Sequence, residues 1–238
     1  MKLLYRFHDH NEIYSKTLHD PNIVLSGEDQ SRHIYYDYKY DSRVEWIANL
    51  QGNTAYIDTG VKGSGDQRIE CIFELIAKTT TWNCVYGART AATGTTHEHD
   101  GIYIYSNNSS NDLGYVGYNN TANNNLAAAF ASLNVKHKFI QDKGLFTLDG
   151  NVIRQYANAT FTCTNATIFI FDANNNGTRG KYYGYFKLYS FKIYNDDVLV
   201  RNFIPVRVRS VGYLFDKVNK ILYGNSGGGS FSFGDDIE

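Results

Sequence analysis

The residues of this 238-residue chain that are best suited to catalysis lie in the segment 97–103 (HEHDGIY). Carboxylates at alternating positions of one strand share a face, and a pair about 5 Å apart can act as nucleophile and general acid in glycoside hydrolysis. Glu98 and Asp100 begin such a pattern, but Tyr103 occupies the position of the acid. Because tyrosine has a pKa near ~10, it protonates a leaving sugar oxygen poorly at neutral pH. We therefore expect no catalysis, with a degenerate glycoside hydrolase as an alternative.

Two His-x-His pairs are candidate metal ligands. One pair is His97 and His99, and the other is His8 and His10. In a strand, both imidazoles of a pair project on one side, and imidazole is a suitable ligand for a transition metal. One chain supplies only two ligands per pair, so such a site requires several copies that meet on an axis. Solvated loop histidines are the simpler interpretation.

A second candidate metal site resembles the first half of a calcium-binding loop. Asp172, Asn174 and Asn176 follow the spacing D-x-N-x-N-G. The twelfth position is Tyr183, whereas a complete loop closes with a bidentate glutamate. An Asn-Gly turn between two strands explains the same residues. We therefore expect no cofactor, with Ca²⁺ or a transition metal as the open alternative.

Several aromatic residues at alternating strand positions could stack on sugar rings, since such rings are amphipathic and offer a large flat face. If they lie on a sheet face, the polar loops 90–100 and 107–125 would help to grip a host surface glycan. Packing in a core is the alternative for all of them. The candidate glycan-binding residues are Trp82, Tyr103, Tyr105 and Tyr115.

The composition predicts a chain made mostly of strands. Aromatic residues make up 15% of the chain (20 Tyr and 14 Phe), with 21 Gly and only 2 Pro, which favours strands joined by glycine turns. A chain of this length can bury roughly 70% of its unfolded surface. The formal net charge of −1 provides no basic stripe for phosphate neutralisation, so we expect no nucleic-acid partner.

The N-terminal segment and the cysteines indicate where the chain is made and in what form its thiols occur. The apolar run at the N-terminus (MKLLYRFHDH) is broken too early by charges for a signal peptide, and no window approaches the ~18 apolar residues of a membrane span. We expect synthesis in a bacterial host cytoplasm and no membrane insertion. Cys71, Cys84 and Cys163 are odd in number and widely spaced, which indicates buried free thiols.

The strongest strand pattern lies in residues 181–227. Apolar side chains change parity between Leu188 and Phe191, which implies a bulge near Ser190 or burial on both sides. The residues 195–197 (NDD) predict a turn, followed by a strand that ends near Pro205. A second short pair is predicted at residues 212–216 and 220–224, which completes a β-meander.

Further strands recur at the intervals of a sandwich. A hairpin is predicted for residues 136–149, turning at residues 142–144. The Asn/Ser-rich segments 107–112 and 119–125 are predicted loops, and residues 126–133 (LAAAFASL) are the one candidate helix. About a dozen strands indicate two packed antiparallel sheets. The expected strands of the central body are 67–77, 83–88, 101–106 and 113–118.

Residues 1–43 differ from the rest, because charges and histidines outnumber aliphatic residues there. We interpret them as an N-terminal arm for attachment or oligomerisation, followed by one domain over residues 44–238. Tyrosines suit interfaces because they are amphipathic, so the arm is expected to dock on its own sandwich, a sister subunit or a larger assembly. The candidate attachment residues are Tyr35, Tyr36, Tyr38 and Tyr40.

The order of motifs resembles the LamG-like (concanavalin-like) jelly-roll modules in virion proteins of tailed phages that infect gut bacteria. The segments that carry this resemblance span residues 44–234 and include AYIDTGV, VYGAR, HKFIQDKGLFTLDGN, IFIFDANNNG, FKLYSFKIYNDDVLVRNFIPVR and GYLFDKVNKILYGNSGGGSF. The N-terminal PNIVLSGEDQSRHIYYD is similar to the segment that introduces such proteins in Bacteroides phages, crAss-like phages among them.

This resemblance implies an all-β fold, namely a two-sheet antiparallel jelly-roll sandwich with an N-terminal extended arm. It also implies a location on the virion, as a head fibre, a capsid decoration or a tail-fibre component. The expected partners are other virion proteins of the capsid or tail, further copies of the chain in a dimer or trimer, and a host surface glycan. A carbohydrate-binding receptor-recognition module is the alternative to a purely structural protein.

Overall fold

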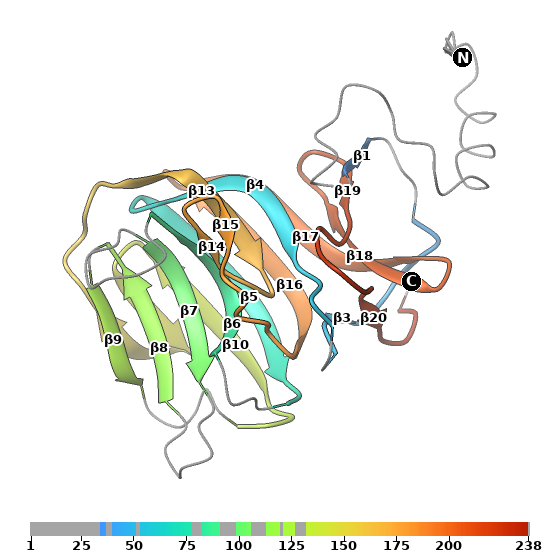
Figure 1. Cartoon of the computed structure of the whole chain (residues 1–238), viewed down its shortest axis with the longest axis horizontal. Helices are drawn as coiled ribbons and strands as arrows, with labels where there is room; N and C mark the ends of the chain where they lie inside the picture. The colour runs from blue at the N-terminus through green and yellow to red at the C-terminus, as the bar shows by residue number, and fades with distance from the viewer. Residues whose placement is uncertain are drawn as a thin grey trace, which may run out of the picture. The chain divides into compact units, whose positions relative to one another are not determined.

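The computed structural model describes residues 34–36, 40–50, 53–77, 82–90, 99–105, 113–119, 121–126 and 132–237. They all belong to one compact unit, Arg32–Glu238. None of the described residues lies in a helix, so none of them forms a helix that could cross a membrane. The strands form two facing sheets (Figure 1), which confirms the expected all-β sandwich.

The larger sheet contains twelve strands within the described residues. They are β1 (Ile34–Tyr36), β2 (Ser42–Arg43), β3 (Ile47–Ala48), β5 (Gln67–Leu75), β10 (Lys136–Asp142), β11 (Leu145–Leu148), β12 (Asn151–Gln155), β16 (Phe186–Asn195), β17 (Val198–Val208), β18 (Val211–Asp216), β19 (Ile221–Tyr223) and β20 (Ser232–Phe233). The main path runs β1-β19-β18-β17-β16-β5-β10-β11-β12. Beside this path, β2 pairs with β17, and β3 pairs with both β16 and β20.

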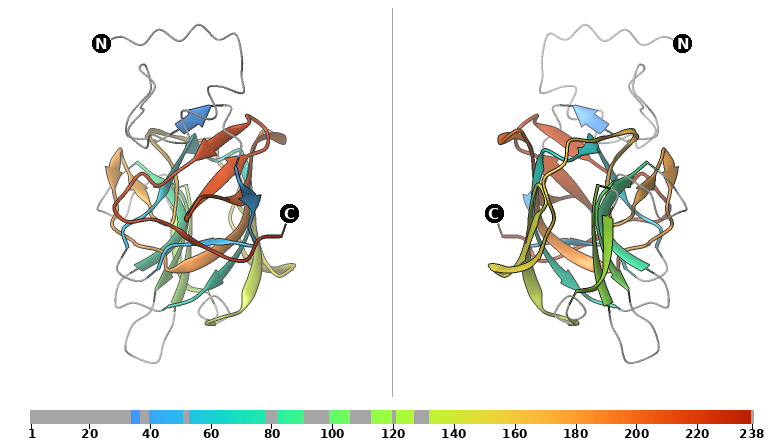
Figure 2. Two further views of the ribbon diagram at one scale, coloured as in Figure 1. Left: turned by 90° about the vertical axis from the view of Figure 1, so that its right-hand side faces the viewer. Right: turned by 90° about the vertical axis from the view of Figure 1, so that its left-hand side faces the viewer.

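The smaller sheet contains eight described strands. They are β4 (Ile57–Ser64), β6 (Trp82–Arg89), β7 (His99–Tyr105), β8 (Leu113–Tyr118), β9 (Thr121–Leu126), β13 (Thr162–Ile170), β14 (Asn174–Asn175) and β15 (Thr178–Arg179). The path runs β15-β14-β6-β7-β8-β9, and β13 pairs with β4 and β6. Figure 2 shows β7 and β8 (green) in a different layer from the β10–β12 hairpins (yellow-green).

The core lies between the inner faces of the two sheets. Tyr86 of the smaller sheet packs edge-on against Phe191 of the larger sheet, with ring centroids 5.5 Å apart. It also packs against Phe139, at 6.2 Å. All three rings are fully buried, and the Tyr86 hydroxyl donates a hydrogen bond to Gln141 Oε1 at 2.5 Å. The buried phenol and the buried amide thus satisfy each other across the two layers.

The parity change in β16 is a β-bulge, as predicted. The register of β16 against β5 shifts between Leu188 and Ser190. Leu188 and Phe191 are both fully buried, although they are an odd number of residues apart. Since side chains alternate between faces, one extra residue is required to return both to the core.

Turns predicted from the sequence are confirmed, whereas one strand end is wrong. Asp196 and Asp197 join β16 to β17 with φ values of 45° and 62°, which small polar residues tolerate. The strand β17 continues past Pro205 to Val208. Pro205 pairs with Leu214, and its carbonyl accepts a hydrogen bond from the N–H of Val44. Pro205 lies beyond the residues of β17 that pair with β16. Its lack of an N–H therefore removes no hydrogen bond of that pairing, and the proline does not end the strand.

The Asn-rich segment 119–125 was predicted as a loop, but residues 121–126 form strand β9. It pairs with β8 over five Cα partners from Tyr118↔Thr121 to Gly114↔Leu126. The low strand propensity of asparagine is overridden because β8 offers a row of backbone partners on that side. Of the candidate helix, Leu126 belongs to β9, residues 127–131 lie outside the described residues, and Leu133 lies in a turn.

Two described pieces of the predicted arm pair with the larger sheet. β1 pairs with β19 through Ile34↔Tyr223 to Tyr36↔Ile221, and β2 pairs with β17. Residues 44 and 45, which follow β2, pair with the C-terminal segment: Val44 forms a β-bridge with Asp236, and the N–H of Glu45 donates to the carbonyl of Asp235. The division into an arm and a domain at residue 43 remains a prediction.

Candidate functional site

The strand register brings the four candidate glycan-binding residues together. Trp82 of β6 is the Cα partner of Tyr105 of β7. Tyr103 of β7 pairs with Cys84 of β6 and with Tyr115 of β8. The four positions therefore lie on three adjacent strands within two neighbouring rows. We refer to Trp82, Tyr103, Tyr105 and Tyr115 as the outer aromatic patch.

Strand alternation gives the parity of these positions relative to the core positions of the same strands. Val116 and Tyr118 of β8 are buried in the core, so Tyr115 has the opposite parity. In β6, a register shift between Cys84 and Tyr86 allows Tyr86 to enter the core while Cys84 belongs to a separate small cluster. The row of positions 84, 103 and 115 therefore differs in parity from the row that contains the core residues Tyr86 and Val116.

The segment 180–184 runs beside β6 at Cys84. The Cys84 N–H donates to the carbonyl of Tyr182 at 3.0 Å. Cys84 and Ala173 are fully buried, and the half-buried Tyr182 packs on them. A Cβ on Gly184 would collide with the carbonyl oxygen of Cys84 and with the ring of Phe186. The segment can approach β6 this closely because residue 184 is glycine. We call residues 180–184 the wall segment.

Arg89, at the end of β6, is held between two neutral groups beside the wall segment. Its Nη2 donates to the hydroxyl of Tyr182 at 2.5 Å, and its Nε donates to Oδ1 of Asn175. The guanidinium carbon also lies 5.1 Å from the centroid of the Tyr182 ring. Asn175 reaches Arg89 because β14 runs parallel to β6 with Asn175 opposite Arg89. The hydroxyl and the ring of Tyr182 are thus both fixed by one cation.

Asp172 anchors the other side of the wall segment. Its carboxylate is fully buried and accepts hydrogen bonds from the N–H groups of Ala173 and Tyr182 and from Nε of Arg179, at 2.7 to 2.8 Å. Burial raises the pKa of Asp172, and these three donors partly oppose the increase. Arg179 in turn stacks between two rings, 4.6 Å from Tyr56 and 4.9 Å from Tyr183. These contacts hold residues 172–183 in place.

The predicted calcium loop is occupied by internal hydrogen bonds. Both oxygens of Asp172 accept the bonds described above. Oδ1 of Asn174 accepts from the N–H of Gly177 at 2.8 Å, and Oδ1 of Asn176 accepts from Asn165 at 3.1 Å. A cation here would have to displace these donors, Arg179 included, and electrostatics oppose that exchange. Binding of Ca²⁺ remains the untested alternative to the expectation of no cofactor.

The candidate histidine site is only partly described. His99 begins β7 and is the Cα partner of Arg89, whereas His97, Glu98, His8 and His10 lie outside the described residues. Within the part of the chain that the structure describes, no three His, Cys, Asp or Glu side chains are grouped closely enough to hold a metal ion. The transition-metal site also remains an untested alternative.

The three cysteines are buried free thiols, as predicted. Burial raises the pKa of Cys71, and it also raises the pKa of Cys84, where the charge of Asp172 adds to the effect. Since the thiolate is the reactive form, these thiols are poor nucleophiles at neutral pH. They fill space in the core and under the wall segment.

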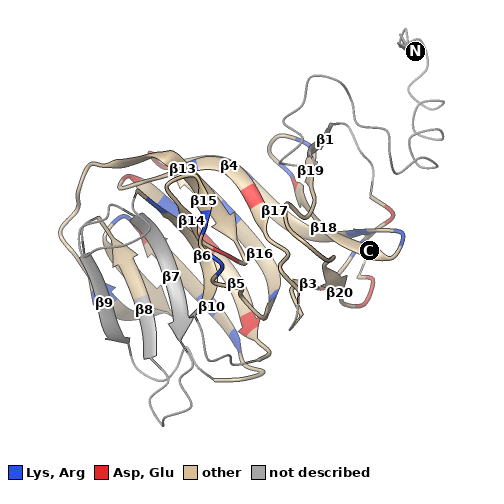
Figure 3. Cartoon of the chain, viewed as in Figure 1, with Lys and Arg blue, Asp and Glu red and all other residues tan. Residues whose placement is uncertain are grey.

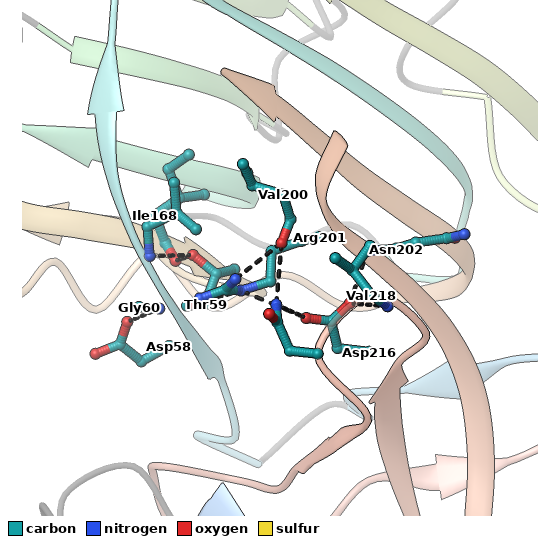
Figure 4. Close-up of polar contacts among 11 residues, drawn as sticks. Asp58, Thr59, Gly60, Ile168, Val200, Arg201, Asn202, Asp216 and Val218 are labelled. Atoms are coloured by element: carbon teal, nitrogen blue, oxygen red, sulfur yellow. Dashed lines mark hydrogen bonds and ion pairs between the residues drawn. The ribbon is translucent and has the colours of Figure 1, made fainter. Parts of the chain in front are cut away.

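A second buried carboxylate, Asp216, has a structural role (Figure 4). Its Oδ1 accepts from the N–H groups of Asn202 and Val218 at 2.9 and 3.0 Å, and its Oδ2 accepts from Asn219 at 2.7 Å. Nε of Arg201 lies 3.7 Å from Oδ2 and donates to the carbonyl of Thr59 at 3.1 Å. The network therefore ties β17 and β18 of the larger sheet to β4 of the smaller sheet.

Charges of both signs are spread over the described strands (Figure 3). On the outer face of the larger sheet, Glu74 binds Lys187 at 2.8 Å and accepts from the hydroxyl of Tyr189 at 2.6 Å. Glu70 lies 3.4 Å from Arg68 and 3.7 Å from Lys192. Such pairs of opposite charge keep this sheet face polar, and they give it no electrostatic potential of a single sign.

The candidate attachment tyrosines are partly placed. Tyr35 and Tyr36 lie on β1, opposite Leu222 and Ile221 of β19. Tyr40 packs edge-on against Phe215 of β18, with ring centroids 5.2 Å apart. Tyr38 lies outside the described residues. A role of these residues in attachment remains a prediction.

Sequence reasoning missed Tyr182, Arg89 and Arg179 beside the outer aromatic patch. Tyr182 and Arg89 are 93 residues apart, so no local motif relates them. Two signals were available: the glycines at 180 and 184 mark a close approach of the backbone, and the run of tyrosines at 182, 183 and 185 marks an amphipathic segment.

No family model matches this chain, and no curated protein matches it. A candidate carbohydrate-binding protein from Bacteroides ovatus ATCC 8483 superposes with a TM-score of 0.49 at 10% identity, over 82% of this chain and 62% of that one. Tailspike protein 2 of Escherichia coli O157:H7 bacteriophage CAB120 superposes with a TM-score of 0.41 at 8% identity, over 66% of this chain and 26% of that one. This chain therefore spans less than two thirds of either protein.

Proposed function

We propose that this chain is a non-enzymatic binding protein that holds a saccharide on the outer face of its smaller sheet. The observation that carries this proposal is the register that places positions 82, 103, 105 and 115 in two neighbouring rows of β6, β7 and β8. Because alternation in β8 gives position 115 the parity opposite to the buried Val116, we take these aromatic residues as the ligand-contacting set. Sugar rings suit such a surface because their C–H faces stack on aromatic rings.

The neighbouring groups support binding rather than catalysis. The two fully buried carboxylates near the smaller sheet, Asp172 and Asp216, each have an arginine partner and further hydrogen-bond donors. A general acid needs a carboxyl group that can release its proton to the substrate, and both groups are committed to the fold. The sequence pattern of Glu98 and Asp100 has Tyr103 at the position of the acid, which also disfavours hydrolysis.

We further propose that this protein is displayed on a virion, as a head fibre, a capsid decoration or a tail-fibre component, and contacts other virion proteins. The sequence resemblance to jelly-roll virion proteins supports this location. The position of β1, a piece of the predicted arm, at the end of the larger sheet's main path favours attachment by strand addition. Self-association in a dimer or trimer is part of the same proposal.

The saccharide proposal is tested with the purified full-length chain against immobilised homo-oligosaccharides of glucose, galactose, mannose, xylose and N-acetylglucosamine, together with bacterial capsular polysaccharide. We expect measurable binding to at least one of them, and roughly tenfold weaker binding after Trp82→Ala or Tyr105→Ala. Tyr194→Ala is the matched control, since Tyr194 stacks on Arg68 at 4.0 Å on the larger sheet.

Three outcomes contradict parts of this proposal. Wild-type protein that binds none of the probes would remove the saccharide function. Equal losses in the Tyr194 control would show that binding does not map to the smaller sheet. New reducing ends released from a bound oligosaccharide, and abolished by Glu98→Ala, would instead show a glycosidase.

Attachment is tested by the light-scattering mass of the full chain beside a chain that lacks residues 1–31, which retains all described strands. A dimer or trimer that becomes a monomer after truncation would support self-association through the arm. Two monomers would contradict it and leave attachment to a different virion protein.

A further inference from the structure

Tyr182 lies beside β6 at Cys84, next to the row of positions 103 and 115. It packs on Cys84, and Cys84 shares a row with Tyr103 and Tyr115. The ring of Tyr182 therefore stands at the end of that row, where β6 meets the wall segment. We propose that Tyr182 is a further saccharide-contacting residue that closes one side of the site, and that Arg89 is its positioning residue.

The position of Tyr182 is set before any ligand binds. Its N–H donates to Asp172 at 2.7 Å, its carbonyl accepts from the N–H of Cys84 at 3.0 Å, and its hydroxyl accepts from Arg89 at 2.5 Å. Gly180 also contributes, because a Cβ there would lie 2.7 Å from the ring. A side chain that is already fixed loses little entropy when a ligand contacts it, which strengthens binding.

Arg89 contacts the side chain of Tyr182 directly. It donates to the hydroxyl, and its guanidinium carbon lies 5.1 Å from the ring centroid. Its own orientation is fixed by Asn175, which is carried on the parallel strand β14. Arg89 thus acts on the ligand through Tyr182, and the expected signature is a change in affinity without a matching change in stability.

The adjacent Tyr183 provides an internal comparison. Its ring lies 4.9 Å from the guanidinium carbon of Arg179, which stacks on Tyr56 of the segment before β4. Tyr183 and Tyr182 are both half-buried, belong to the same wall segment and have the same side chain. They differ in their partners, since Tyr182 alone packs on Cys84. Substituting each of them separates a saccharide contact from a general effect on the loop.

The inference rests on the proposed saccharide function, and its test uses the full-length chain with the probe from the panel that binds most tightly. We expect Tyr182→Ala to raise Kd roughly tenfold or more, and Tyr182→Phe and Arg89→Gln to raise it roughly threefold. Tyr183→Ala should leave Kd unchanged. Thermal midpoints measured in parallel separate affinity from stability, because Tyr182→Phe keeps the ring that packs on Cys84.

The outcomes distinguish this inference from the function on which it rests. If Tyr182→Ala binds like wild type while Trp82→Ala and Tyr105→Ala lose binding, the role of Tyr182 is refuted and the saccharide site stands. If Tyr183→Ala weakens binding as much as Tyr182→Ala, the effect belongs to the loop and the inference is also refuted. If the wild-type chain binds no probe, both are refuted.

Discussion

Replacing Asp216 by alanine is expected to destabilise the sandwich more than any exposed charge substitution in the described chain. The carboxylate is fully buried and holds two backbone N–H groups, the amide of Asn219 and the guanidinium of Arg201. Removing it leaves Arg201, whose side chain is only 19% exposed, without its counter-ion. An unpaired charge in that setting is costly because protein replaces most of its solvent.

The magnitude follows from these contacts. Removing one partner of a buried ion pair typically costs about 3–5 kcal/mol, and a hydrogen bond to a charged group contributes roughly 1.5–3 kcal/mol. These terms overlap because they share one carboxylate, so we expect about 3–5 kcal/mol in total. In a domain of this size, 1 kcal/mol corresponds to roughly 2–4 °C, so the thermal midpoint should fall by roughly 6–20 °C.

The assay is urea unfolding followed by circular dichroism, with the thermal midpoint as a second measure. Asp216→Asn should cost less than Asp216→Ala, because Oδ1 still accepts from Asn202 and Val218. Asp236→Asn is the matched control, since its two bonds to Arg207 are short (2.6 Å) but its side chain is 47% exposed. If Asp216→Ala shifts the midpoint no more than this control does, the argument from burial is wrong.

Three further predictions concern single contacts. Tyr86→Phe should lower the free energy of unfolding in urea by about 1–3 kcal/mol, because Oε1 of the fully buried Gln141 would lose the hydroxyl donor that now lies 2.5 Å away. An unchanged midpoint would show that another donor replaces it. Gly184→Ala should lower the thermal midpoint clearly, because the new Cβ would collide with the backbone of Cys84. Gly150→Ala is the control: its Cβ would meet no atom within 4 Å, so that substitution tests only the effect of the positive φ of 84°. Burial opposes ionisation of Asp149, but hydrogen bonds from His137 and the N–H of Lys138 outweigh it and lower its pKa. Its contribution to stability is therefore present above the unfolded pKa of about 3.9 and is lost as pH falls through the lower folded value, so Asp149→Asn should flatten the loss of stability below about pH 4.

Local patterns in the sequence determined most of the strands and turns. The parity change at Leu188 and Phe191 predicted the bulge, because alternation of side chains is a property of the backbone itself. The two aspartates after Asn195 predicted a tight turn because residues of this type tolerate a positive φ. The same local reasoning failed for β9, where pairing with β8 decided the outcome for a segment of low strand propensity.

Alternation also indicated which aromatic residues share a face within one strand, but it gave no information on their neighbours in other strands. The sequence therefore contained Trp82, Tyr103, Tyr105 and Tyr115 as candidates without placing them together. Their assembly depends on the pairing of β6, β7 and β8 and on a register shift at Cys84. A shift of one residue in that register would move each side chain to the other face.

Only the tertiary structure decided that the loop 172–184 returns to β6. Arg89 and Tyr182 lie 93 residues apart, and Arg179 and Thr54 lie 125 residues apart, yet both pairs are joined by hydrogen bonds. Contacts over such distances depend on which strands become neighbours in a sheet, and that order is chosen by the packing of the whole core. The sequence by itself determined an all-β chain with its bulge and turns, whereas the arrangement of β6, β14 and the wall segment followed from the fold.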